Sequence, residues 1–529
     1  MKFMSLLGLA AIFGIGNAGA AETESTPQAR CAALRTIDFT RVTDATTQLL
    51  KTEVAKLTPD SPDACMVEGY VTPNIGIRMA LPLTGWNGRF FQGGCGGSCG
   101  NARLSWCDEP ITRGYACLST DMGHTSGGLD WTWADNNLQA MADFGFRATH
   151  RATLAGKAIV EAYYHSAPKF SYFQGCSTGG RQAMVAAQNF PWDFDGIIAG
   201  APAINWTGAG MGLWWNVMAN RRKGGGQILQ EADIRLLHAA VVEKCDALDG
   251  LKDGIIGDPR ECKFDPAVLQ CKTENASACL SPEKVEAVRK IYAGPHTSDG
   301  KPLYTGSAQP GSELNWLAPY IGVDGKPAVY AGFIGNQWQF AGFSPSPGPH
   351  WDPARFDFDK DYQRLGLVEP LLSGSNPDLR KFKARGGKLI GYQGYDDQSI
   401  VPLNFIDYYE TATRTMGGLS QTQDFFRLFM IPGMNHCLGG VGADAVNYLD
   451  YLEKWVENGQ APDIMIGTHV KAVAGATRSM LFPIPAEKVE FTRPHFPYPA
   501  QARYKGSGNP NDAANFVRTI AGDQTKKAK

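Results

Sequence analysis

Short apolar runs separated by polar, glycine-rich stretches are the clearest pattern in this chain. Runs of this length that are bounded by turn residues are typical of buried β-strands. We expect strands at residues 77–83, 89–92, 115–120, 170–174, 196–199, 388–392 and 426–431. The run at 181–188 is expected to be helical. Strands that alternate with helices in this way indicate an α/β fold.

The strands are interrupted by a long middle segment. Residues 205–385 are rich in Gly, Pro, Trp and turn signals, and strand-like runs resume only at residue 388. No Pro/Ser linker or internal repeat divides the chain, despite its 529 residues. The pattern therefore predicts one α/β domain formed by residues 21–204 and 386–529, with residues 205–385 inserted as a lid domain.

Residues 175–179 form a Gly-x-Ser-x-Gly box between a strand-like and a helix-like run. At such an elbow the chain turns sharply, and the flanking glycines avoid the clashes that a Cβ atom would cause. Ser177 is therefore a candidate nucleophile. The alternative is a turn of small residues, because the pattern alone often arises by chance.

Chain order directs the search for the other catalytic groups, because in this arrangement an acid follows the serine and a histidine follows the acid. His436 lies in a Gly/Asn loop directly after the run at 426–430, a setting that His469 and His495 lack. The run at 388–394 leads into the pair Asp396 and Asp397, either of which could orient His436. The residues themselves do not separate the two.

The cysteines beside the serine and the histidine add a constraint. Cys176 precedes Ser177 and Cys437 follows His436. If serine and histidine are within hydrogen-bond reach, their neighbours can lie within the short Cα separation that a disulfide requires. A bridge would then join nucleophile to base, whereas the alternative is two unrelated thiols.

Three segments, 175–181, 394–397 and 432–437, resemble the tannase and feruloyl esterase family of α/β-hydrolases, which includes bacterial mono(2-hydroxyethyl) terephthalate hydrolases. The likeness continues through 86–91, 194–202 and 502–508. That family links a Cys-Ser motif to a His-Cys motif through a disulfide, and its Gly-x-x-Asp pattern implies Asp397 as the acid. The resemblance implies an α/β-hydrolase fold with a large inserted lid and a Ser177, Asp397, His436 triad.

An ester hydrolase of this kind also needs two amides that stabilise the oxyanion. The amide of Thr178, at the start of the helix after Ser177, is the first expected donor. The glycine-rich stretch 92–97 fits the loop that supplies the second. We expect Gly94 in this role, with Gly93 and Cys95 as alternatives, since the family's glycine loop aligns here with gaps.

The middle segment carries an acidic loop at 245–256. Three carboxylates within eight residues, with glycines that permit tight curvature, can surround a hard cation, although an acidic turn without metal is the alternative. Its register is not that of an EF-hand. The resemblance implies a structural Ca²⁺ held by Asp246, Asp249 and Asp253 and by the backbone oxygens of Leu251 and Ile255.

All twelve cysteines lie after residue 20, an even number that is consistent with an oxidising compartment. The resemblance implies further disulfides for Cys245 with Cys262, Cys271 with Cys279, and Cys31 with Cys65. Cys95, Cys99, Cys107 and Cys117 then remain, and their three possible pairings cannot be ranked.

The first twenty residues have a Lys near the start, an apolar stretch and Ala-Gly-Ala at the end, as in a signal peptide. No later run is long and apolar enough for a transmembrane helix. The formal charge of −2 gives no basis for binding nucleic acid or an anionic membrane. We therefore expect a secreted or periplasmic protein whose partner is a small aromatic ester.

The substrate class is the least determined property. The resemblance implies esters of hydroxycinnamic or gallic acids, with a terephthalate monoester as the alternative. The terephthalate-ester hydrolases have a lid arginine that meets the free carboxylate of their substrate. Residues 320–345 contain no arginine, so phenolic esters are favoured over terephthalate monoesters. A second alternative is a non-catalytic, calcium-dependent binding protein on a hydrolase scaffold. The middle segment offers aromatic residues for the substrate or the core: Trp206, Trp214, Trp215, Trp316, Tyr320, Trp338 and Phe340.

Overall fold

A nine-stranded sheet forms the centre of the molecule in the computed structural model, which describes residues 26–273, 278–471 and 482–520. The strand order is β1-β2-β3-β5-β4-β6-β7-β8-β9. The strands are β1 (Thr47–Lys56), β2 (Asp63–Val71), β3 (Ile75–Pro82), β4 (Arg89–Gly93), β5 (Ala116–Thr120), β6 (Phe170–Cys176), β7 (Gly196–Gly200), β8 (Lys388–Gly394) and β9 (Phe426–Ile431).

All seven expected runs are strands, and the six strands from β5 to β9 in sheet order pair in parallel. β1, β2 and β3 add an antiparallel edge. β1 and β2 were not expected, because β1 is largely exposed and polar and lacks the apolar run of a buried strand. The α/β class is confirmed.

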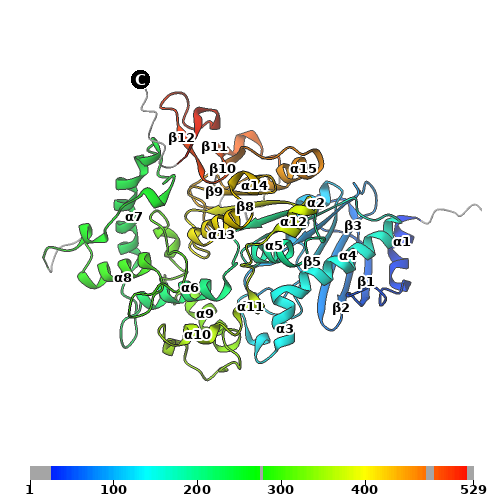
Figure 1. Ribbon diagram of the computed structural model, residues 1–529, viewed down its shortest axis with the longest axis horizontal. Coiled ribbons are helices and arrows are strands. Elements are labelled where there is room, and N and C mark those ends of the chain that lie inside the picture. The colour runs from blue at the N-terminus through cyan, green and yellow to red at the C-terminus, as the bar shows by residue number, and fades with distance from the viewer. Residues whose placement is uncertain (1–25, 274–277, 472–481, 521–529) are drawn as a thin grey trace, which may run out of the picture.

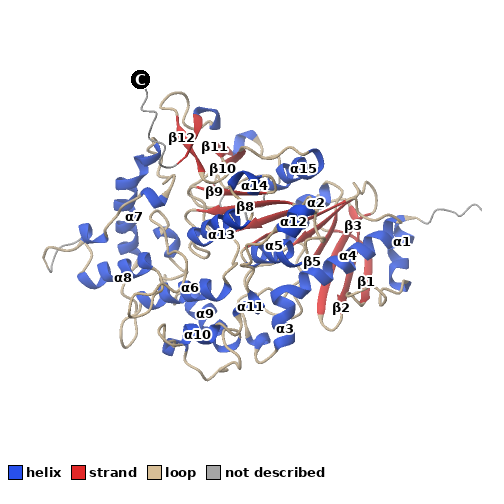
Figure 2. Ribbon diagram, in the orientation of Figure 1, coloured by secondary structure: helices blue, strands red, loops and turns tan. Residues whose placement is uncertain are grey.

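Helices cover both faces of the sheet, as Figure 2 shows. The helices are α1 (Pro27–Ala33), α2 (Asp108–Thr112), α3 (Leu138–Ala142), α4 (Ala148–Tyr164), α5 (Thr178–Asn189), α6 (Trp206–Ala219), α7 (Glu231–Cys245), α8 (Pro282–Ala293), α9 (Val329–Phe340), α10 (Asp361–Leu365), α11 (Glu369–Leu372), α12 (Arg380–Ala384), α13 (Pro402–Thr415), α14 (Leu419–Gln423) and α15 (Tyr448–Asn458).

Successive strand residues point into different cores because side chains alternate across a strand. Phe173 of β6 belongs to the cluster under α4, α5 and α13, whereas its neighbour Tyr172 belongs to the cluster under α2 and α15. Leu389 and Ile390 of β8 divide in the same way. Burial on both faces explains why these strands are continuously apolar in sequence.

The segment between β7 and β8 has a hydrophobic cluster of its own, with Trp316 and Trp338 fully buried in it. It contains α6 to α12, and Figure 1 shows its green helices α6 to α10 on the side of the molecule opposite the blue strands β1 to β3. The strands β7 and β8 are nevertheless direct neighbours in the sheet. The segment therefore leaves the sheet at the carboxyl end of β7 and re-enters it at the amino end of the neighbouring strand β8.

Two small antiparallel sheets follow the last long helix: β10 (Met465–Val470) with β11 (Val489–His495), and β12 (Ala500–Tyr504) with β13 (Phe516–Ile520). The expected signal peptide, residues 1–20, lies outside the described residues. Among the helices of the described ranges, none has both the length and the apolar character needed to cross a membrane.

Candidate active site

Ser177 occupies the sharp turn between β6 and α5. Its backbone has φ 63° and ψ −121°, a conformation that costs free energy for a residue with a Cβ atom. Its amide donates to the carbonyl oxygen of Gly200 at 3.0 Å, and its own carbonyl oxygen accepts the amides of Arg181 (3.0 Å) and Ala203 (3.2 Å). These three hydrogen bonds hold the turn in place.

Glycines allow α5 to approach the sheet at this turn. A Cβ atom on Gly175 would lie 2.6 Å from the carbonyl carbon of Gly179, and one on Gly180 would lie 2.1 Å from the carbonyl oxygen of Gly200. Both distances are too short for any side chain, so glycine is required at Gly175 in the box and at Gly180 directly after it.

Asp397 and His436 form a pair at the carboxyl ends of β8 and β9. The Nδ1 atom of His436 lies 2.9 Å from Oδ2 and 3.1 Å from Oδ1 of Asp397, which is fully buried. Oδ1 also accepts the amides of Ser399 (2.7 Å) and Ile400 (2.9 Å), and Oδ2 accepts Nε2 of Gln393 (2.9 Å). The carboxylate is thereby fixed so that it orients the imidazole.

Asp396 faces another set of residues. Its carboxyl lies 3.5 Å from the position of a Cβ atom built on Gly311, and no described residue donates a hydrogen bond to it. The pKa of Asp396 is raised to about 7, mainly by burial and also by the nearby Glu313, whereas His238 opposes the shift. Only Asp397 contacts His436, and this geometry separates the two carboxylates that the sequence left open.

A disulfide joins the neighbours of the serine and the histidine. The sulfur atoms of Cys176 and Cys437 are 2.05 Å apart and their Cα atoms 5.9 Å apart, although 261 positions separate them in sequence. The disulfide therefore joins the residue directly before Ser177 to the residue directly after His436.

The amide of Gly94, the expected second oxyanion donor, already has an acceptor in this structure. It donates to the carbonyl oxygen of Gln174 at 2.9 Å and continues the pairing of β4 with β6. The amide of Cys95 is also engaged, by Oε1 of Gln182 at 3.2 Å. Gly93, the other alternative, is the last residue of β4. Within the described chain, no acceptor receives the amides of Gly96 and Gly97, which follow in the same loop.

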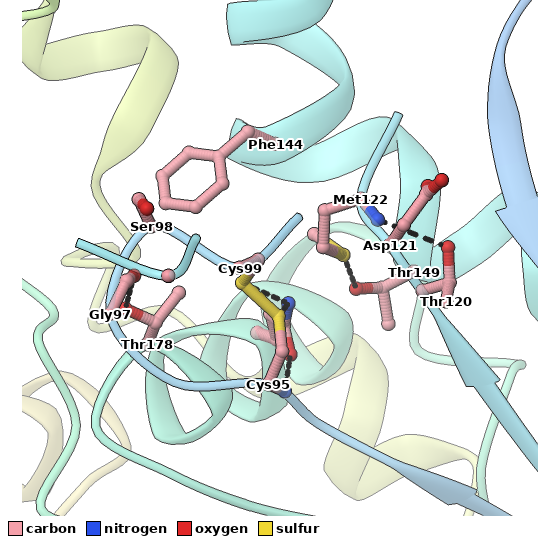
Figure 3. Close-up of a disulfide and its surroundings, with 12 residues drawn as sticks. Cys95, Gly97, Ser98, Cys99, Thr120, Asp121, Met122, Phe144, Thr149 and Thr178 are labelled. Carbon is pink, nitrogen blue, oxygen red and sulfur yellow. Dashed lines mark hydrogen bonds between the residues drawn. A yellow bond between two sulfur atoms is a disulfide. The ribbon is translucent and has the colours of Figure 1, made fainter. Parts of the chain in front are cut away.

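Thr178 connects the serine turn to this glycine loop. Its hydroxyl donates to the carbonyl oxygen of Gly97 at 2.6 Å, and its amide belongs to the first turn of α5, where helical amides lack partners within the helix. Figure 3 shows Thr178 beside Gly97, next to the disulfide between Cys95 and Cys99.

That disulfide resolves one of the pairings left open by the sequence. Cys95 and Cys99 are linked, with their Cα atoms 5.4 Å apart, whereas Cys107 and Cys117 are buried free thiols. The three other expected disulfides are present in the structure: Cys31 with Cys65, Cys245 with Cys262, and Cys271 with Cys279.

The inserted segment contacts the loop that carries Asp397 and the loop that carries His436. Nδ2 of Asn315 donates to the carbonyl oxygen of Asp396 (3.0 Å) and to Oδ1 of Asn435 (2.7 Å), the residue before His436. The hydroxyl of Tyr320 donates to the carbonyl oxygen of Gln398. Sequence reasoning missed Asn315, because a lone asparagine 120 positions from its partner carries no recognisable pattern.

A buried acid lies behind these contacts. Glu313 is fully buried and accepts hydrogen bonds from Tyr292 (2.6 Å) and from the amide of Gly311 (2.8 Å), and Nδ1 of His238 lies 2.9 Å from it. It belongs to the same turn as Asn315. This turn is thus held firmly beneath the loop that carries Asp396 and Asp397.

Most of the expected aromatic residues belong to the core. Six of them are at most 7% exposed: Trp206, Trp214, Trp316, Tyr320, Trp338 and Phe340. Trp215 is partly exposed, and its Nε1 donates to the carbonyl oxygen of Lys290 at 2.7 Å.

The carboxylates of the acidic loop accept hydrogen bonds mainly from amides of the loop itself. Asp246 accepts the amides of Asp253 (3.2 Å) and Gly254 (3.1 Å), Asp249 accepts the amide of Leu251 (3.0 Å), and Arg493 lies 2.7 Å from Asp253. Burial raises the pKa of Asp249 to about 7, and the charges of Asp253 and Asp246 contribute. In the described part of the chain, no three metal-ligating side chains are gathered into a cation site. The calcium set, including the backbone oxygen of Ile255, stays a prediction.

Comparison with known proteins places this geometry among ester hydrolases. A family model described as tannase and feruloyl esterase matches residues 60–519. The mono(2-hydroxyethyl) terephthalate hydrolase of Piscinibacter sakaiensis is 35% identical over 86% of this chain and 85% of that protein. The probable feruloyl esterase B-2 of Aspergillus flavus is 35% identical over 77% of this chain and 80% of that protein.

A solved structure gives the same result for the fold. The crystal structure of feruloyl esterase B from Aspergillus oryzae superposes with a TM-score of 0.82 at 27% identity, over 93% of this chain and 100% of that one. The predicted α/β-hydrolase fold is confirmed.

Proposed function

We propose that this chain, which belongs to the tannase and feruloyl esterase family and is a carboxylic ester hydrolase, cleaves esters of hydroxycinnamic or gallic acids. The residues proposed to act are Ser177, His436 and Asp397. Membership in this family excludes the non-catalytic binding protein that the sequence left open. The observation that carries the residue assignment is the contact of His436 with Asp397 beside the Cys176–Cys437 disulfide.

In the first half of the reaction His436 accepts the proton of the Ser177 hydroxyl as its oxygen attacks the ester carbonyl carbon. The tetrahedral oxyanion is stabilised by the amide of Thr178 and by an amide of the glycine loop, at Gly96 or Gly97. His436 then donates its proton to the departing alcohol. An acyl-serine remains.

In the second half water replaces the alcohol. His436 takes a proton from water, the hydroxide oxygen attacks the acyl carbon, and the same amides stabilise the second oxyanion. The carboxylic acid leaves and Ser177 recovers its proton. Asp397 keeps His436 in the tautomer that can accept a proton at Nε2 throughout.

The inserted segment acts as a lid domain in this proposal. Its contacts through Asn315 and Tyr320 reach the loops of both His436 and Asp397, and such a cover can exclude water and shape the acyl site. A relative named as a mono(2-hydroxyethyl) terephthalate hydrolase supports the alternative substrate, a terephthalate monoester.

We further propose a structural Ca²⁺ at the acidic loop. The donors are all oxygens, which suits a hard cation. Among the described residues, Asp253 has an ion pair, with Arg493, whereas none is formed by Asp246 or Asp249. Asp246, Asp249 and Asp253, with the backbone oxygens of Leu251 and Ile255, would hold the Ca²⁺. The ion would neutralise this buried charge and brace the loop closed by Cys245 and Cys262.

Five disulfides and the leader-like residues 1–20 support a secreted or periplasmic location. No charge pattern supports a nucleic-acid or membrane partner.

The proposal is tested with purified protein on methyl ferulate, methyl gallate, chlorogenate and mono(2-hydroxyethyl) terephthalate. We expect turnover of the first three, and a loss of about 10³–10⁶-fold in kcat for Ser177→Ala. A fluorophosphonate probe should label the wild type and spare Ser177→Ala. Equal labelling of both proteins would reject Ser177 as the nucleophile.

A further inference from the structure

The glycine loop after β4 is held by the loop that follows β5. The amide of Ser98 donates to the carbonyl oxygen of Gly128 at 2.8 Å, and the hydroxyl of Ser126 donates to the carbonyl oxygen of Cys99 at 3.2 Å. A further contact comes from the imidazole of His124. The ester chemistry described above gives this histidine no role.

His124 is buried, with 4% of its surface exposed, and its ring stacks on that of Trp133 with the ring centroids 3.7 Å apart. Its Nε2 atom lies 2.8 Å from the carbonyl oxygen of Ser98. A carbonyl oxygen can only accept a hydrogen bond, so Nε2 carries the proton and donates it. Burial lowers the pKa of His124 to about 4, and the ring is therefore a neutral donor near pH 7.

Two hydrogen bonds connect this imidazole to a free amide of the glycine loop. The carbonyl oxygen that accepts from His124 belongs to the peptide group between Ser98 and Cys99, and the N–H of the same peptide group donates to the carbonyl oxygen of Gly96 at 2.9 Å. The peptide group between Gly96 and Gly97 thus has its oxygen engaged, while its N–H has no acceptor within the described chain. The series that begins at His124 therefore ends at the amide of Gly97.

This free amide belongs to a residue that contacts the serine turn. The hydroxyl of Thr178, the residue after Ser177, donates to the carbonyl oxygen of Gly97 at 2.6 Å. The amide of Gly96 is free as well, but in the described ranges no donor reaches the oxygen of its own peptide group, that of Cys95. Of the two amides, that of Gly97 has the more firmly fixed direction.

A fixed and polarised amide is what an oxyanion requires. Donors of an oxyanion hole act best when they are aimed in advance at the position where negative charge develops. Peptide groups that are hydrogen-bonded in series also polarise one another, so that the N–H at the end of the series becomes a stronger donor. A buried N–H at the start of such a series serves both purposes.

We propose that His124 is a positioning residue of the esterase, which aims the amide of Gly97 at the oxyanion through the peptide groups of Ser98–Cys99 and Gly96–Gly97. The inference rests on the proposed ester hydrolysis, and it selects Gly97 from the two amides left open there. His124 acts only through the glycine loop and exchanges no proton during the reaction.

Two substitutions separate the N–H donor from the packing of the ring. His124→Phe keeps a ring against Trp133 but has no N–H, so it should lower kcat on methyl ferulate by about 10- to 100-fold, less than the about 10²–10³-fold loss of an oxyanion donor itself. His124→Gln loses the ring but keeps an N–H near the position of Nε2, so kcat should stay within about fivefold of the wild type. KM should change by less than about threefold in both variants, because the oxyanion forms only after binding.

A boronic acid tests the same amide without turnover. Benzeneboronic acid forms a tetrahedral adduct with a catalytic serine, and one oxygen of the adduct takes the place of the oxyanion. Its Ki should rise in His124→Phe by the factor by which kcat/KM falls, as expected of a transition-state analogue. A loss of packing alone would not produce this proportion.

Two variants act as controls. Ser126→Ala removes the hydrogen bond to the carbonyl oxygen of Cys99, which lies in the same loop but outside the series that ends at Gly97. His296→Phe removes a histidine of the inserted segment that lies beside Trp215 and whose Nδ1 atom is 2.9 Å from a backbone carbonyl oxygen. Both variants should keep kcat within about threefold of the wild type.

Circular dichroism verifies that each variant is folded at the assay temperature, and His124→Leu takes the place of His124→Phe if the latter does not fold. A His124→Phe variant with wild-type kcat, or one more active than His124→Gln, would overturn the role of His124. The proposed function survives that result if a fluorophosphonate labels Ser177 and the wild type hydrolyses methyl ferulate. A wild type that is neither labelled nor inhibited by the boronic acid rejects both.

Discussion

The triad loops and the acidic loop at 246–255 were both expected from short motifs, yet they differ in how complete they are. Asp397 receives four polar contacts, from His436, Gln393, Ser399 and Ile400. The carboxylates of the acidic loop accept amides of their own loop, and only Asp253 has a cationic partner in the described chain.

The difference follows from what holds each region together. The triad loops are fixed by the ends of β6, β8 and β9 and by a covalent link, so that protein groups alone complete them. The carboxylates of the acidic loop would instead be completed by the proposed cation. We infer that a site whose partners are all protein groups can be recognised from the structure directly. A site whose partner would be an ion has to be tested by measuring ion binding.

The largest expected effect separates the two adjacent acids of the triad loop. Asp397→Asn should lower kcat by about 10⁴-fold, because an amide favours the wrong tautomer of the catalytic histidine. Asp396→Asn should leave kcat within about threefold, since Asp396 makes no contact with His436. Steady-state kinetics on methyl ferulate decide the matter, and a larger loss in Asp396→Asn would reverse the assignment.

The next test concerns the Cys176–Cys437 disulfide, which is proposed to hold the loops of Ser177 and His436 together. Replacing Cys176 and Cys437 together by Ser should abolish most activity at a temperature at which near-ultraviolet circular dichroism still reports a folded protein. Removal of a native disulfide costs about 2–5 kcal/mol of stability. The matched control replaces Cys271 and Cys279, which are 8 positions apart in the inserted segment, and should keep full activity. Equal activity of both double variants would refute a positioning role.

Removal of calcium tests whether the proposed ion at the acidic loop stabilises the folded protein. Chelation should lower the Tm of the wild type, since a ligand at 100 times its Kd contributes about 2.7 kcal/mol. Asp249→Asn should lower Tm in the presence of calcium and make it insensitive to chelation. A wild-type Tm that is the same with calcium and with chelator would remove the proposed ion.

The smallest effect concerns pH and the buried Asp396. Its pKa of about 7 in the folded protein lies above its ordinary value of 3.8, so the folded state binds this proton more tightly. That contribution to stability is complete below about pH 4 and is lost as the pH rises through about 7. Asp396→Asn should therefore stabilise the protein at pH 8, by on the order of 2 kcal/mol, and much less at pH 5. Denaturant unfolding at the two pH values measures the difference, and an equal change at both would contradict the burial argument.

The sequence predicted the parts of the fold that depend on local pattern. β6, β8 and β9 are buried on both faces and therefore appear as continuous apolar runs, and Ser177 and His436 follow directly from the loops that end them. β1 lies at the exposed edge of the sheet and has no such run. Its position depends on pairing with β2, which the local pattern does not encode.

The rest of the site depends on contacts between residues distant in sequence. Asp396 and Asp397 follow the same strand, and hydrogen bonds from Gln393 and from the amides of Ser399 and Ile400 hold the carboxylate of Asp397, which contacts His436. Gly94 was a reasonable expectation from a glycine-rich loop, but the sheet extends one residue further and engages its amide. The contacts of Asn315 with Asp396 and Asn435 could not be predicted from the sequence, because they depend on how the inserted segment packs against the loops after β8 and β9.

The adjacency of β7 and β8 has a consequence for engineering. Gly196 pairs with Lys388 and Gly200 with Tyr392, so the whole inserted segment connects two strands that are direct neighbours in the sheet. Exchange of that stretch for the equivalent stretch of another member would leave the ladder's register untouched. The segment between β7 and β8 is thus an exchangeable unit. We expect its replacement to change the substrate preference of the enzyme while the central sheet is retained.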